Sequence, residues 1–335
     1  MAIRPQTSPR HGGDLVFATA QYGTPPAGWL DLSTGINPAS YPIGKIVVAS
    51  PGRLPGRDAL DQLLAAARTA YGLPAGAAIA AVPGSEVAIG LLPLIAPAGA
   101  VAVVGPTYGS HAGAWQDSAC RVIEVGDVSQ IPTDVTIAVV VNPNNPDGRT
   151  FPPSTLTALA RALGERGGLL VVDEAFADAN PEISLVPMLA GLSAVVLRSL
   201  GKFYGLAGLR LGFVAGEPAL VTRLASILGD WPVSSAALTI GAQALSDRRW
   251  RDATRASLKE QNNKLRSLLT RHRLAIKGHT HLFVLIEDLD AAGLHRRLAG
   301  QGIWARAFVS QPTWLRLGLP GAGMDRLDQA LTACR

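Results

Sequence analysis

Apolar residues gather in short runs rich in Val and Ile, and stretches of helical character separate most of these runs. A short, fully apolar run that is bounded by Gly or Pro is typical of a strand buried on both faces. We predict such strands at residues 77–82, 101–104, 122–125, 136–141 and 194–197, and in the run that ends at Asp173. Helices are predicted at residues 57–71, 85–95 and 154–166. The alternation predicts an α/β fold with a mostly parallel sheet between two layers of helices.

The pattern changes from about residue 217 onward. Longer helical stretches and isolated strand-like segments predict a second and smaller α/β domain there. The predicted helices are residues 217–228, 236–272, 290–300 and one from Met324 onward, and the predicted strands are residues 282–286, 303–308 and 314–317. We expect an N-terminal arm and substrate loop (residues 1–40), a large domain (41–222) and a small C-terminal domain (223–335).

The composition is that of a compact globular protein, because nearly half of the residues are apolar and only 16% are charged. The net charge of +5 suits an anionic small molecule, and no basic stripe indicates nucleic-acid binding. The most apolar region, residues 88–104, contains Pro93 and Pro97, which argues against a membrane span. The chain starts without the apolar core of a signal peptide, and its two cysteines lack metal or disulfide spacing. We therefore expect a cytoplasmic protein that binds neither membranes nor nucleic acid.

The segment from Ser199 to Arg210 carries the most distinctive chemistry. Lys202 follows a predicted buried strand and lies in a turn of Gly and Ser. A lysine in such a place can be desolvated, which lowers its pKa and frees its amine to attack a carbonyl. The alternative is a lysine in a surface loop, and only partners elsewhere in the chain decide between the two.

Other strand ends supply possible partners. Gly84, Ser85 and Glu86 start a predicted helix, where free N–H groups and the helix dipole suit a phosphate, although helix capping also explains them. Tyr108 follows another strand and either stacks on a flat ligand or packs in the core. The turn-forming cluster at residues 142–148 lies at a strand end, where open α/β sheets bind ligands.

Asp173 ends a fully apolar strand, and a buried carboxylate is costly unless it has a partner. That partner is either a helix N-terminus or a cationic group, such as a protonated ring nitrogen or a metal ion. The cluster His279-Thr280-His281 is too short to indicate a metal site, and we predict none. Gly84, Gly148 and Gly205 do not form a dinucleotide-binding fingerprint.

Two segments near the N-terminus offer groups for an anion. His11-Gly12-Gly13-Asp14 lies in a stretch with little periodicity, which we interpret as a flexible arm capped by an acid. Residues 30–38 predict a short strand and a turn, in which Ser33, Thr34 and Asn37 offer hydroxyl and N–H groups. A purely structural turn is equally consistent with this segment.

With these motifs in this order, the chain resembles the class I and II aminotransferases, which are fold type I enzymes that use pyridoxal 5'-phosphate. The resemblance implies that Lys202 binds the cofactor aldehyde covalently and that Asp173 pairs with the ring nitrogen. It also implies that Tyr108 stacks on the ring and that Asn145 contacts the ring hydroxyl oxygen. The residues implied for the cofactor phosphate are Gly84, Ser85, Glu86, Ser199 and Arg210.

Arg316, in Trp314-Leu315-Arg316-Leu317-Gly318, matches the arginine with which this family binds a substrate α-carboxylate. The pieces around His11, Ser33, Phe176 and Arg316 resemble the subgroup of threonine-phosphate decarboxylases of cobalamin biosynthesis. The resemblance implies a homodimer that converts L-threonine O-3-phosphate to (R)-1-aminopropan-2-ol O-2-phosphate and CO₂. The residues implied for the substrate are His11, Gly12, Ser33, Thr34, Gly35, Asn37, Asn145 and Arg316.

Two departures from the family pattern bear on this interpretation. Phe176 stands where a tyrosine is common, so the ring oxygen of the cofactor loses one hydroxyl partner. Leu54-Pro55-Gly56 stands where a Tyr-Pro-Asp segment often reaches a partner subunit, which leaves that contact open. The alternatives are a transaminase, above all a histidinol-phosphate aminotransferase, and a non-catalytic protein built on the same fold.

Overall fold

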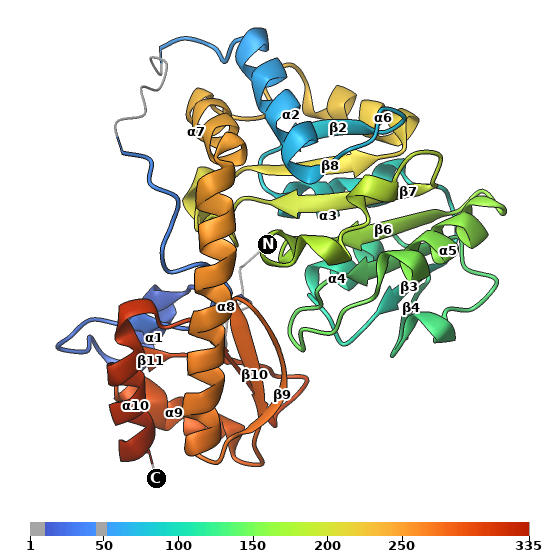
Figure 1. Ribbon diagram of the computed structural model, residues 1–335. Helices are drawn as coiled ribbons and strands as arrows, with labels where there is room; N and C mark the ends of the chain where they lie inside the picture. Colours follow the sequence, from blue (N-terminus) through green and yellow to red (C-terminus); the bar gives the residue numbers. More distant parts are fainter. Residues whose placement is uncertain (1–10, 45–51, 335) are drawn as a thin grey trace. The chain divides into compact units, whose positions relative to one another are not determined.

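The computed structural model describes residues 11–44 and 52–334, which form two compact units (Figure 1). The central unit contains the described residues from Ser40 to Arg255. The terminal unit combines the described residues up to Ala39 with those from Ala256 onward. The three domains expected at residues 1–40, 41–222 and 223–335 stay a prediction. Within the described residues, no helix is both long enough and apolar enough to cross a membrane.

The central unit is built around a seven-stranded sheet with the strand order β2-β8-β7-β6-β5-β3-β4 (Figure 1). Strand β8 is antiparallel to both of its neighbours, and the other pairs are parallel, which confirms the predicted mostly parallel sheet. The strands are β2 (Ala78–Val82), β3 (Val101–Val104), β4 (Val122–Val125), β5 (Ile137–Val141), β6 (Leu169–Asp173), β7 (Ala194–Ser199) and β8 (Gly212–Gly216).

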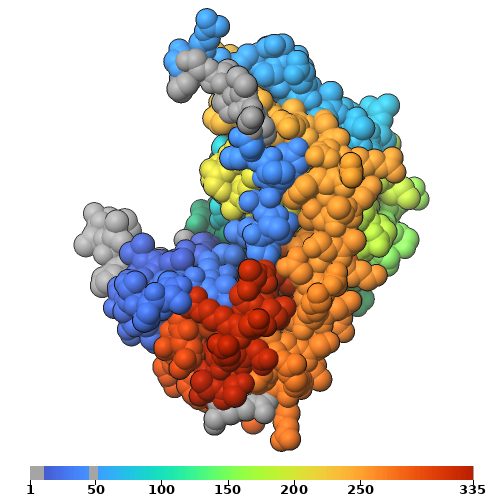
Figure 2. Space-filling model, turned by 60° about the vertical axis from the view of Figure 1, so that its left-hand side comes forward, coloured from blue at the N-terminus to red at the C-terminus, as the bar shows by residue number. Residues whose placement is uncertain are grey.

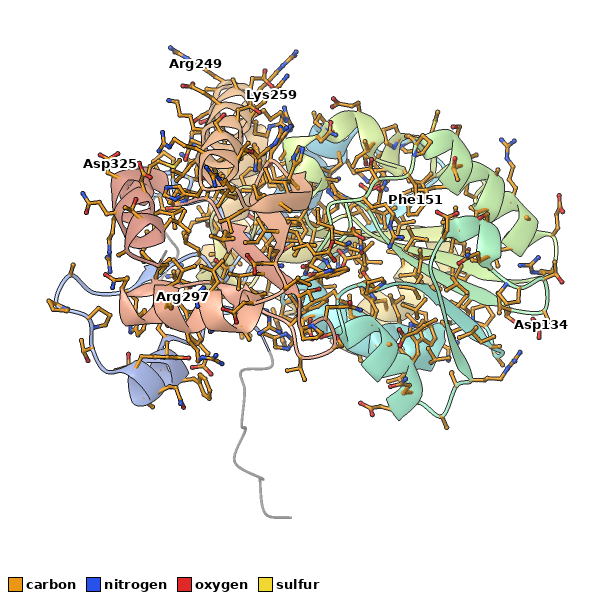
Figure 3. The ribbon with its side chains drawn as sticks, turned by 90° about the horizontal axis from the view of Figure 1, so that it is seen from below. Asp134, Phe151, Arg249, Lys259, Arg297 and Asp325 are labelled. Carbon is orange, nitrogen blue, oxygen red and sulfur yellow. The ribbon has the colours of Figure 1, made fainter. Side chains whose placement is uncertain are left out.

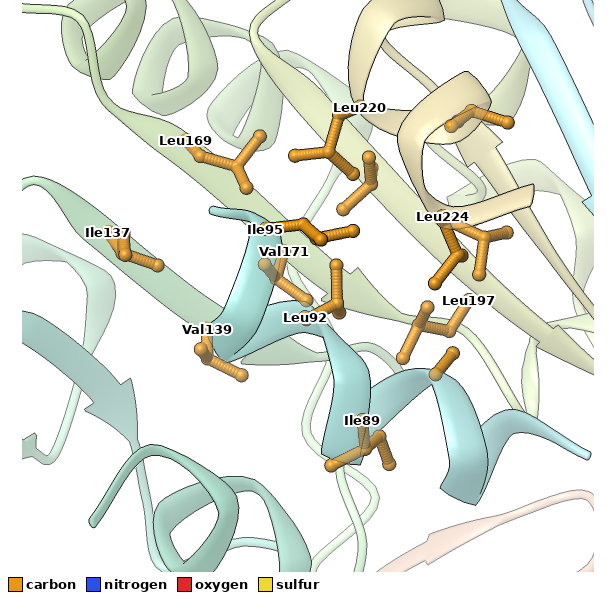
Figure 4. Packing of buried hydrophobic residues seen from close by; sticks show 14 of the residues in the cluster. Ile89, Leu92, Ile95, Ile137, Val139, Leu169, Val171, Leu197, Leu220 and Leu224 are labelled. Carbon is orange, nitrogen blue, oxygen red and sulfur yellow. The ribbon is translucent and has the colours of Figure 1, made fainter. Parts of the chain in front are cut away.

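Helices pack on both faces of this sheet. The helices of the central unit are α2 (Arg57–Tyr71), α3 (Ser85–Ile95), α4 (Ser110–Asp117), α5 (Pro153–Gly164), α6 (Pro218–Leu228), α7 (Ser235–Ser246) and the start of α8 (Arg248–Arg271). On one face, apolar side chains of α3 and α6 point toward those of the strands (Figure 4). The labelled members of this cluster are Ile89, Leu92, Ile95, Ile137, Val139, Leu169, Val171, Leu197, Leu220 and Leu224. Strand residues that point to the opposite face, such as Val140 and Val172, are also fully buried.

The terminal unit has a four-stranded antiparallel sheet of order β12-β13-β10-β9 and a parallel pair, β1 and β11. Its strands are β1 (Leu30–Asp31), β9 (Ala275–Thr280), β10 (Phe283–Glu287), β11 (Ile303–Trp304), β12 (Arg306–Ala307) and β13 (Trp314–Gly318). Its helices are α1 (Leu15–Tyr22), the rest of α8, α9 (Ala291–Gly300) and α10 (Met324–Ala333). In Figure 2, α10 lies against the last turns of α8, and the side chain of Asp328 binds both Arg271 and His272 there.

The structure corrects several predicted elements. The arm expected to be flexible contains α1, whose N-terminus is capped by Asp14 through a bond to Phe17 N. The single helix predicted at 236–272 is divided at Asp247, which caps the start of α8 through Trp250 N. The strand predicted at 303–308 is divided into β11 and β12, and the sequence analysis missed β8 and β9. The caps at Asp14 and Asp247 form through side chains and leave no trace in the hydrophobic periodicity, and the two glycines of β8 weaken its strand pattern.

A buried charged network lies directly behind the end of β6. Glu174 Oε2 accepts hydrogen bonds from Arg198 Nη1 at 2.7 Å and from Ser184 Oγ at 2.6 Å, and Oε1 accepts from Leu185 N at 2.6 Å. Arg198 Nη2 donates to Asp178 Oδ1 at 2.7 Å. Burial alone would lower the pKa of Arg198, but the two carboxylates reverse this effect and raise it above its ordinary value. The network therefore holds one cation between two anions in the interior of the central unit.

We predict that replacing Arg198 with methionine destabilises the protein by about 3–5 kcal/mol, because two buried carboxylates lose their shared cation. Burial already raises the pKa of Glu174, and loss of the cation raises it further. The folded variant then binds more protons than its unfolded chain, so its stability falls as the pH rises. Urea unfolding of wild type and variant should therefore give a smaller loss at about pH 5 than at about pH 8.

A matched control is Arg121→Met, because Arg121 pairs with Asp134 at the surface, where both side chains are more than half exposed. Asp134 points outward in Figure 3. Loss of an exposed pair costs about 0–1 kcal/mol at either pH. An equal loss for Arg198→Met at both pH values would contradict the charged state proposed for the network.

Candidate active site

The carboxyl ends of the parallel strands meet at one edge of the central sheet. Asp173, the last residue of β6, lies opposite Val141, the last residue of β5. In the antiparallel strand β8, Gly212 lies opposite both Ser199 of β7 and Val82 of β2. The loops that follow these strands hold the residues predicted to bind the cofactor, and they share the edge at which α/β folds bind ligands.

Gly84 and Gly212 allow a close approach of three segments at this edge. A Cβ atom on Gly84 would lie 2.5 Å from Arg210 Nη2, and one on Gly212 would lie 2.9 Å from Ser85 N. Gly84 also has a φ of +85°, which favours glycine, and the first turn of α3 that follows it has no side-chain cap. The Arg210 guanidinium thus lies next to the N-terminus of α3, where N–H groups and positive charge favour a phosphate.

Ser199 contributes the third segment of this cradle. Its side chain is buried, and its Oγ accepts a hydrogen bond from Gly201 N at 3.2 Å. The bond shapes the turn that leads to Lys202. The structure therefore brings together Gly84, Ser85, Ser199 and Arg210, and their role in binding the cofactor phosphate stays a prediction.

Asp173 has two partners, and the sequence analysis missed one of them. Its Oδ1 accepts from Ala175 N at 2.9 Å, as expected of a carboxylate that caps the next turn. Its Oδ2 lies 2.9 Å from His111 Nε2, and the side chain of His111 is 1% exposed. His111 comes one helical turn after Tyr108, but this spacing alone does not distinguish it from a core histidine. The histidine fixes the direction of the carboxylate at the strand end.

Tyr108 connects His111 to the start of α3. Its hydroxyl donates to Glu86 Oε2 at 2.9 Å, and its ring meets the His111 ring edge-on with 6.3 Å between the centroids. Burial raises the pKa of Tyr108 to about 12, and Glu86 adds to this effect. The phenol is therefore protonated near neutral pH and acts as a donor, and the stacking of its ring on the cofactor stays a prediction.

The turn after β5 contains asparagines with different roles. Asn142 exchanges hydrogen bonds of 2.9 and 3.0 Å with the backbone of Phe151, which lies in the interior (Figure 3). Asn144 accepts from Thr107 Oγ1 at 2.6 Å, so its amide holds the turn against the loop after β3. Asn145 is half-buried, in contrast to these two buried residues, and its contact with the cofactor stays a prediction.

Lys202 is half-buried, and its Nζ lies 5.4 Å from the centre of the Phe176 ring. An ammonium group over an aromatic face is attracted by the electrons of the ring. Phe176, which stands where the family usually has a tyrosine, therefore faces Lys202. Lys202, Asp173, Tyr108 and the phosphate cradle all belong to the central unit.

The predicted substrate residues belong to the terminal unit, apart from Asn145. Arg316 is 6% exposed, and its Nη2 donates to Ser33 O at 2.7 Å. Gly13 N donates to Ser33 Oγ at 2.7 Å, which brings the segment that starts at His11 to the same residue. Thr34 and Gly35 continue this turn, and Asn37 Oδ1 accepts from Ala39 N. His11, Gly12, Ser33 and Arg316 thus lie in one cluster, and their role in substrate binding stays a prediction.

A cavity of 420 Å³ opens beside this cluster, within the terminal unit. It is lined by His11, Gly12, Ser33, Arg306, and aromatic residues that include Phe17 and Trp304. Arg306 lies directly opposite Arg316 in the antiparallel pair β12 and β13, so both side chains leave the same face of the sheet. The positive charges of Arg306 and Arg316 repel each other when their side chains are directly opposite, and an anion bound between them would offset this repulsion. The sequence analysis missed Arg306, because the division between β11 and β12 hid its register.

Comparison with known proteins agrees with this geometry. The sequence profile of aminotransferase class I and II matches residues 51–333. The chain belongs to the class I and II aminotransferase family. It is 42% identical over 325 residues to the threonine-phosphate decarboxylase of a Sinorhizobium species, a match that covers 96% of this chain and 97% of that protein. It is also 42% identical to the threonine-phosphate decarboxylase of Pseudomonas aeruginosa, with 96% of each covered.

Solved structures of this family have the same fold. The crystal structure of L-threonine-O-3-phosphate decarboxylase from Porphyromonas gingivalis superposes with a TM-score of 0.76 at 17% identity, and covers 90% of this chain and 98% of that one. Class I and II aminotransferases are enzymes that use pyridoxal 5'-phosphate. This chain is likewise an enzyme that uses pyridoxal 5'-phosphate. Its residues fit that cofactor, because the cradle at Gly84 suits a phosphate, and an amine and a buried carboxylate lie at the same sheet edge.

We predict that His111→Phe weakens the binding of pyridoxal 5'-phosphate by about tenfold to a hundredfold, because a hydrogen bond to a charged group contributes about 1.5–3 kcal/mol. The substitution keeps an aromatic ring but removes the bond to Asp173. Titration of the cofactor-free protein with the cofactor measures the affinity directly. His272→Phe is a matched control, because it breaks a similar bond to Asp328 in the terminal unit. Equal affinities of the two variants would refute a cofactor role for His111.

Proposed function

We propose that this chain is a threonine-phosphate decarboxylase of cobalamin biosynthesis. It would convert L-threonine O-3-phosphate to (R)-1-aminopropan-2-ol O-2-phosphate and CO₂. The observation that carries the proposal is the identity of 42% over almost the full length of two proteins with that name. The two opposed arginines of the terminal unit support it, because the substrate carries two separate anionic groups.

The central unit would hold the cofactor. Lys202 would bind it covalently, and Asp173, oriented by His111, would keep the ring nitrogen protonated. Tyr108 would stack on the ring, and Asn145 would contact its hydroxyl oxygen. The residues for the cofactor phosphate would be Gly84, Ser85, Glu86, Ser199 and Arg210. When bound, pyridoxal 5'-phosphate accepts the electron pair that the broken bond leaves on the substrate α-carbon.

The terminal unit would recognise the substrate through its two anionic groups. Arg316 would bind the α-carboxylate with its planar guanidinium, as a bidentate partner. The substrate phosphate would be bound by His11, Gly12, Ser33, Thr34, Gly35 and Asn37. Asn145, which belongs to the central unit, is kept in this proposal as a predicted substrate residue. The positive charge of Arg306 favours the same dianion.

The position of the carboxylate decides which bond breaks. The bound cofactor would promote cleavage of the α-carbon bond that the protein orients for reaction, so the residues of a decarboxylase must hold the carboxylate in that position. Loss of CO₂ would leave an electron pair that the bound cofactor accepts, and the α-carbon would then need one proton. Lys202 would donate the proton that replaces the carboxyl group, since its amine follows β7 at the sheet edge where Asp173 ends β6 and an amine can act as a general acid.

An aminotransferase for histidinol phosphate is the second candidate, because it would use the same lysine, acid and phosphate cradle. The two reactions differ in their need for a second substrate, since a transaminase requires a 2-oxo acid to regenerate its cofactor. A homodimer in the cytoplasm is the expected form of the enzyme. The segment Leu54-Pro55-Gly56 leaves open how a second subunit would approach the cofactor.

The test is to supply carboxyl-labelled L-threonine O-3-phosphate to the purified protein with pyridoxal 5'-phosphate. We expect labelled CO₂ and aminopropanol phosphate in equal amounts, without any 2-oxo acid. Lys202→Ala should release no CO₂ and should retain no covalently bound cofactor after borohydride reduction, as measured by peptide mass spectrometry. Turnover that requires a 2-oxo acid and releases no CO₂ would favour the transaminase instead.

A further inference from the structure

We propose that Asp31 is a positioning residue of the substrate site, which acts through Ser33 to hold the His11–Gly13 segment and Arg316 in place. The inference rests on the proposed function for the identity of the substrate. It adds a residue to which the sequence motifs assign no role. All of the atoms that carry it belong to the terminal unit.

One carboxylate oxygen of Asp31 controls Ser33. Asp31 Oδ1 accepts from Ser33 N at 2.8 Å and from Ser33 Oγ at 2.6 Å. A hydroxyl group has one hydrogen, so donation to Asp31 leaves the lone pairs of Ser33 Oγ for other donors. Gly13 N donates to that oxygen at 2.7 Å. The carboxylate therefore orients the hydroxyl group of Ser33 so that its oxygen accepts the hydrogen bond from Gly13 N.

The fit between this segment and Ser33 is close. A Cβ atom on Gly12 would lie 2.2 Å from Ser33 O, so a larger residue at position 12 could not keep this contact. Gly13 has a φ of +87°, a conformation that favours glycine. His11 lines the cavity of the terminal unit. The next two residues, Gly12 and Gly13, lie against Ser33 and thereby hold His11 in place.

The carbonyl group of the same serine orients the substrate arginine. Ser33 O accepts from Arg316 Nη2 at 2.7 Å, and the Arg316 guanidinium lies 5.1 Å from the centre of the Phe283 ring. The backbone next to Ser33 is fixed as well, because Gly318 N donates to Leu32 O at 2.7 Å. The N–H and hydroxyl groups of Ser33 bind Asp31, its hydroxyl oxygen also binds Gly13, and its carbonyl group binds Arg316.

Asp31 is negatively charged and is therefore unsuited to bind the anionic substrate directly. Its Oδ1 already accepts two hydrogen bonds, and a carboxylate repels a phosphate. Arg306 and Arg316 supply the positive charge on the face of β12 and β13. A negative acceptor strengthens the bonds to Ser33, because hydrogen bonds to ionised groups are about twice as strong as neutral ones.

The experiment compares Asp31→Ala, Asp31→Asn, Ser33→Ala and the double variant Asp31→Ala/Ser33→Ala in the full chain with its cofactor. We expect Asp31→Ala and Ser33→Ala each to raise KM for L-threonine O-3-phosphate about tenfold, with kcat reduced by less than about threefold. Asp31→Asn should restore part of the loss, because the amide oxygen still accepts from Ser33. The double variant should be no worse than Ser33→Ala, because both changes break one pathway.

Hydrogen exchange without substrate provides a second and independent measurement. Peptides that contain Gly13 N should lose protection in Asp31→Ala and in Ser33→Ala, while peptides from α10 should keep theirs. The control Asp328→Ala removes a carboxylate with two charged partners in the same unit, and it should leave both KM and the protection of Gly13 unchanged. This control separates a local effect from general destabilisation, and the milder Asp31→Asn serves if Asp31→Ala fails to fold.

Additive effects in the double variant, or normal protection of Gly13 in Asp31→Ala, would overturn the proposal. The exchange measurement does not depend on the substrate. If wild type releases no CO₂ but Asp31→Ala exposes Gly13, the proposed function fails while the coupling from Asp31 through Ser33 stands. If wild type is active and neither KM nor exchange changes, the role of Asp31 is wrong and the function stands.

Discussion

The hydrogen bonding of β8 to both β2 and β7 is the constraint on which the cofactor site depends. Through this strand, segments that are far apart in the sequence come together at Gly84, Ser199 and Gly212. The approach is possible because two of these residues lack a side chain, and Arg210 then lies next to the start of α3. A phosphate cradle of this kind needs no residue that is unusual by itself, since its specificity comes from the register of three strands.

Two buried carboxylates at the end of β6 are the second constraint on this edge of the sheet. Asp173 and Glu174 are adjacent in sequence but have separate partners, since His111 and Ala175 N bind the first and Arg198 binds the second. A buried carboxylate is costly without such partners. Because Arg198 binds Glu174 and Asp178, the carboxylate of Asp173 is held at the strand end by a separate set of partners.

The sequence predicted the parts of the structure that local chemistry determines. The apolar strands, the lysine turn and the acid at the end of β6 each have a signal within a few residues. The sequence analysis missed His111 and Arg306, because their roles depend on a neighbour that only the fold supplies. It missed β8 for the opposite reason, since the glycines that permit the close packing of that strand also weaken its strand pattern.

The choice between breaking a C–C bond and a C–H bond cannot lie in the groups that the two reactions share. Lysine, acid and phosphate cradle serve a transaminase as well as a decarboxylase, so the choice depends on the orientation of the substrate. In the proposed function, orientation would depend on Arg316, whose guanidinium is held by the carbonyl group of Ser33 and the ring of Phe283. The proposed role of Asp31 is of this kind, because it would hold Ser33 and thereby the arginine that orients the substrate, without any contact to the reacting bond.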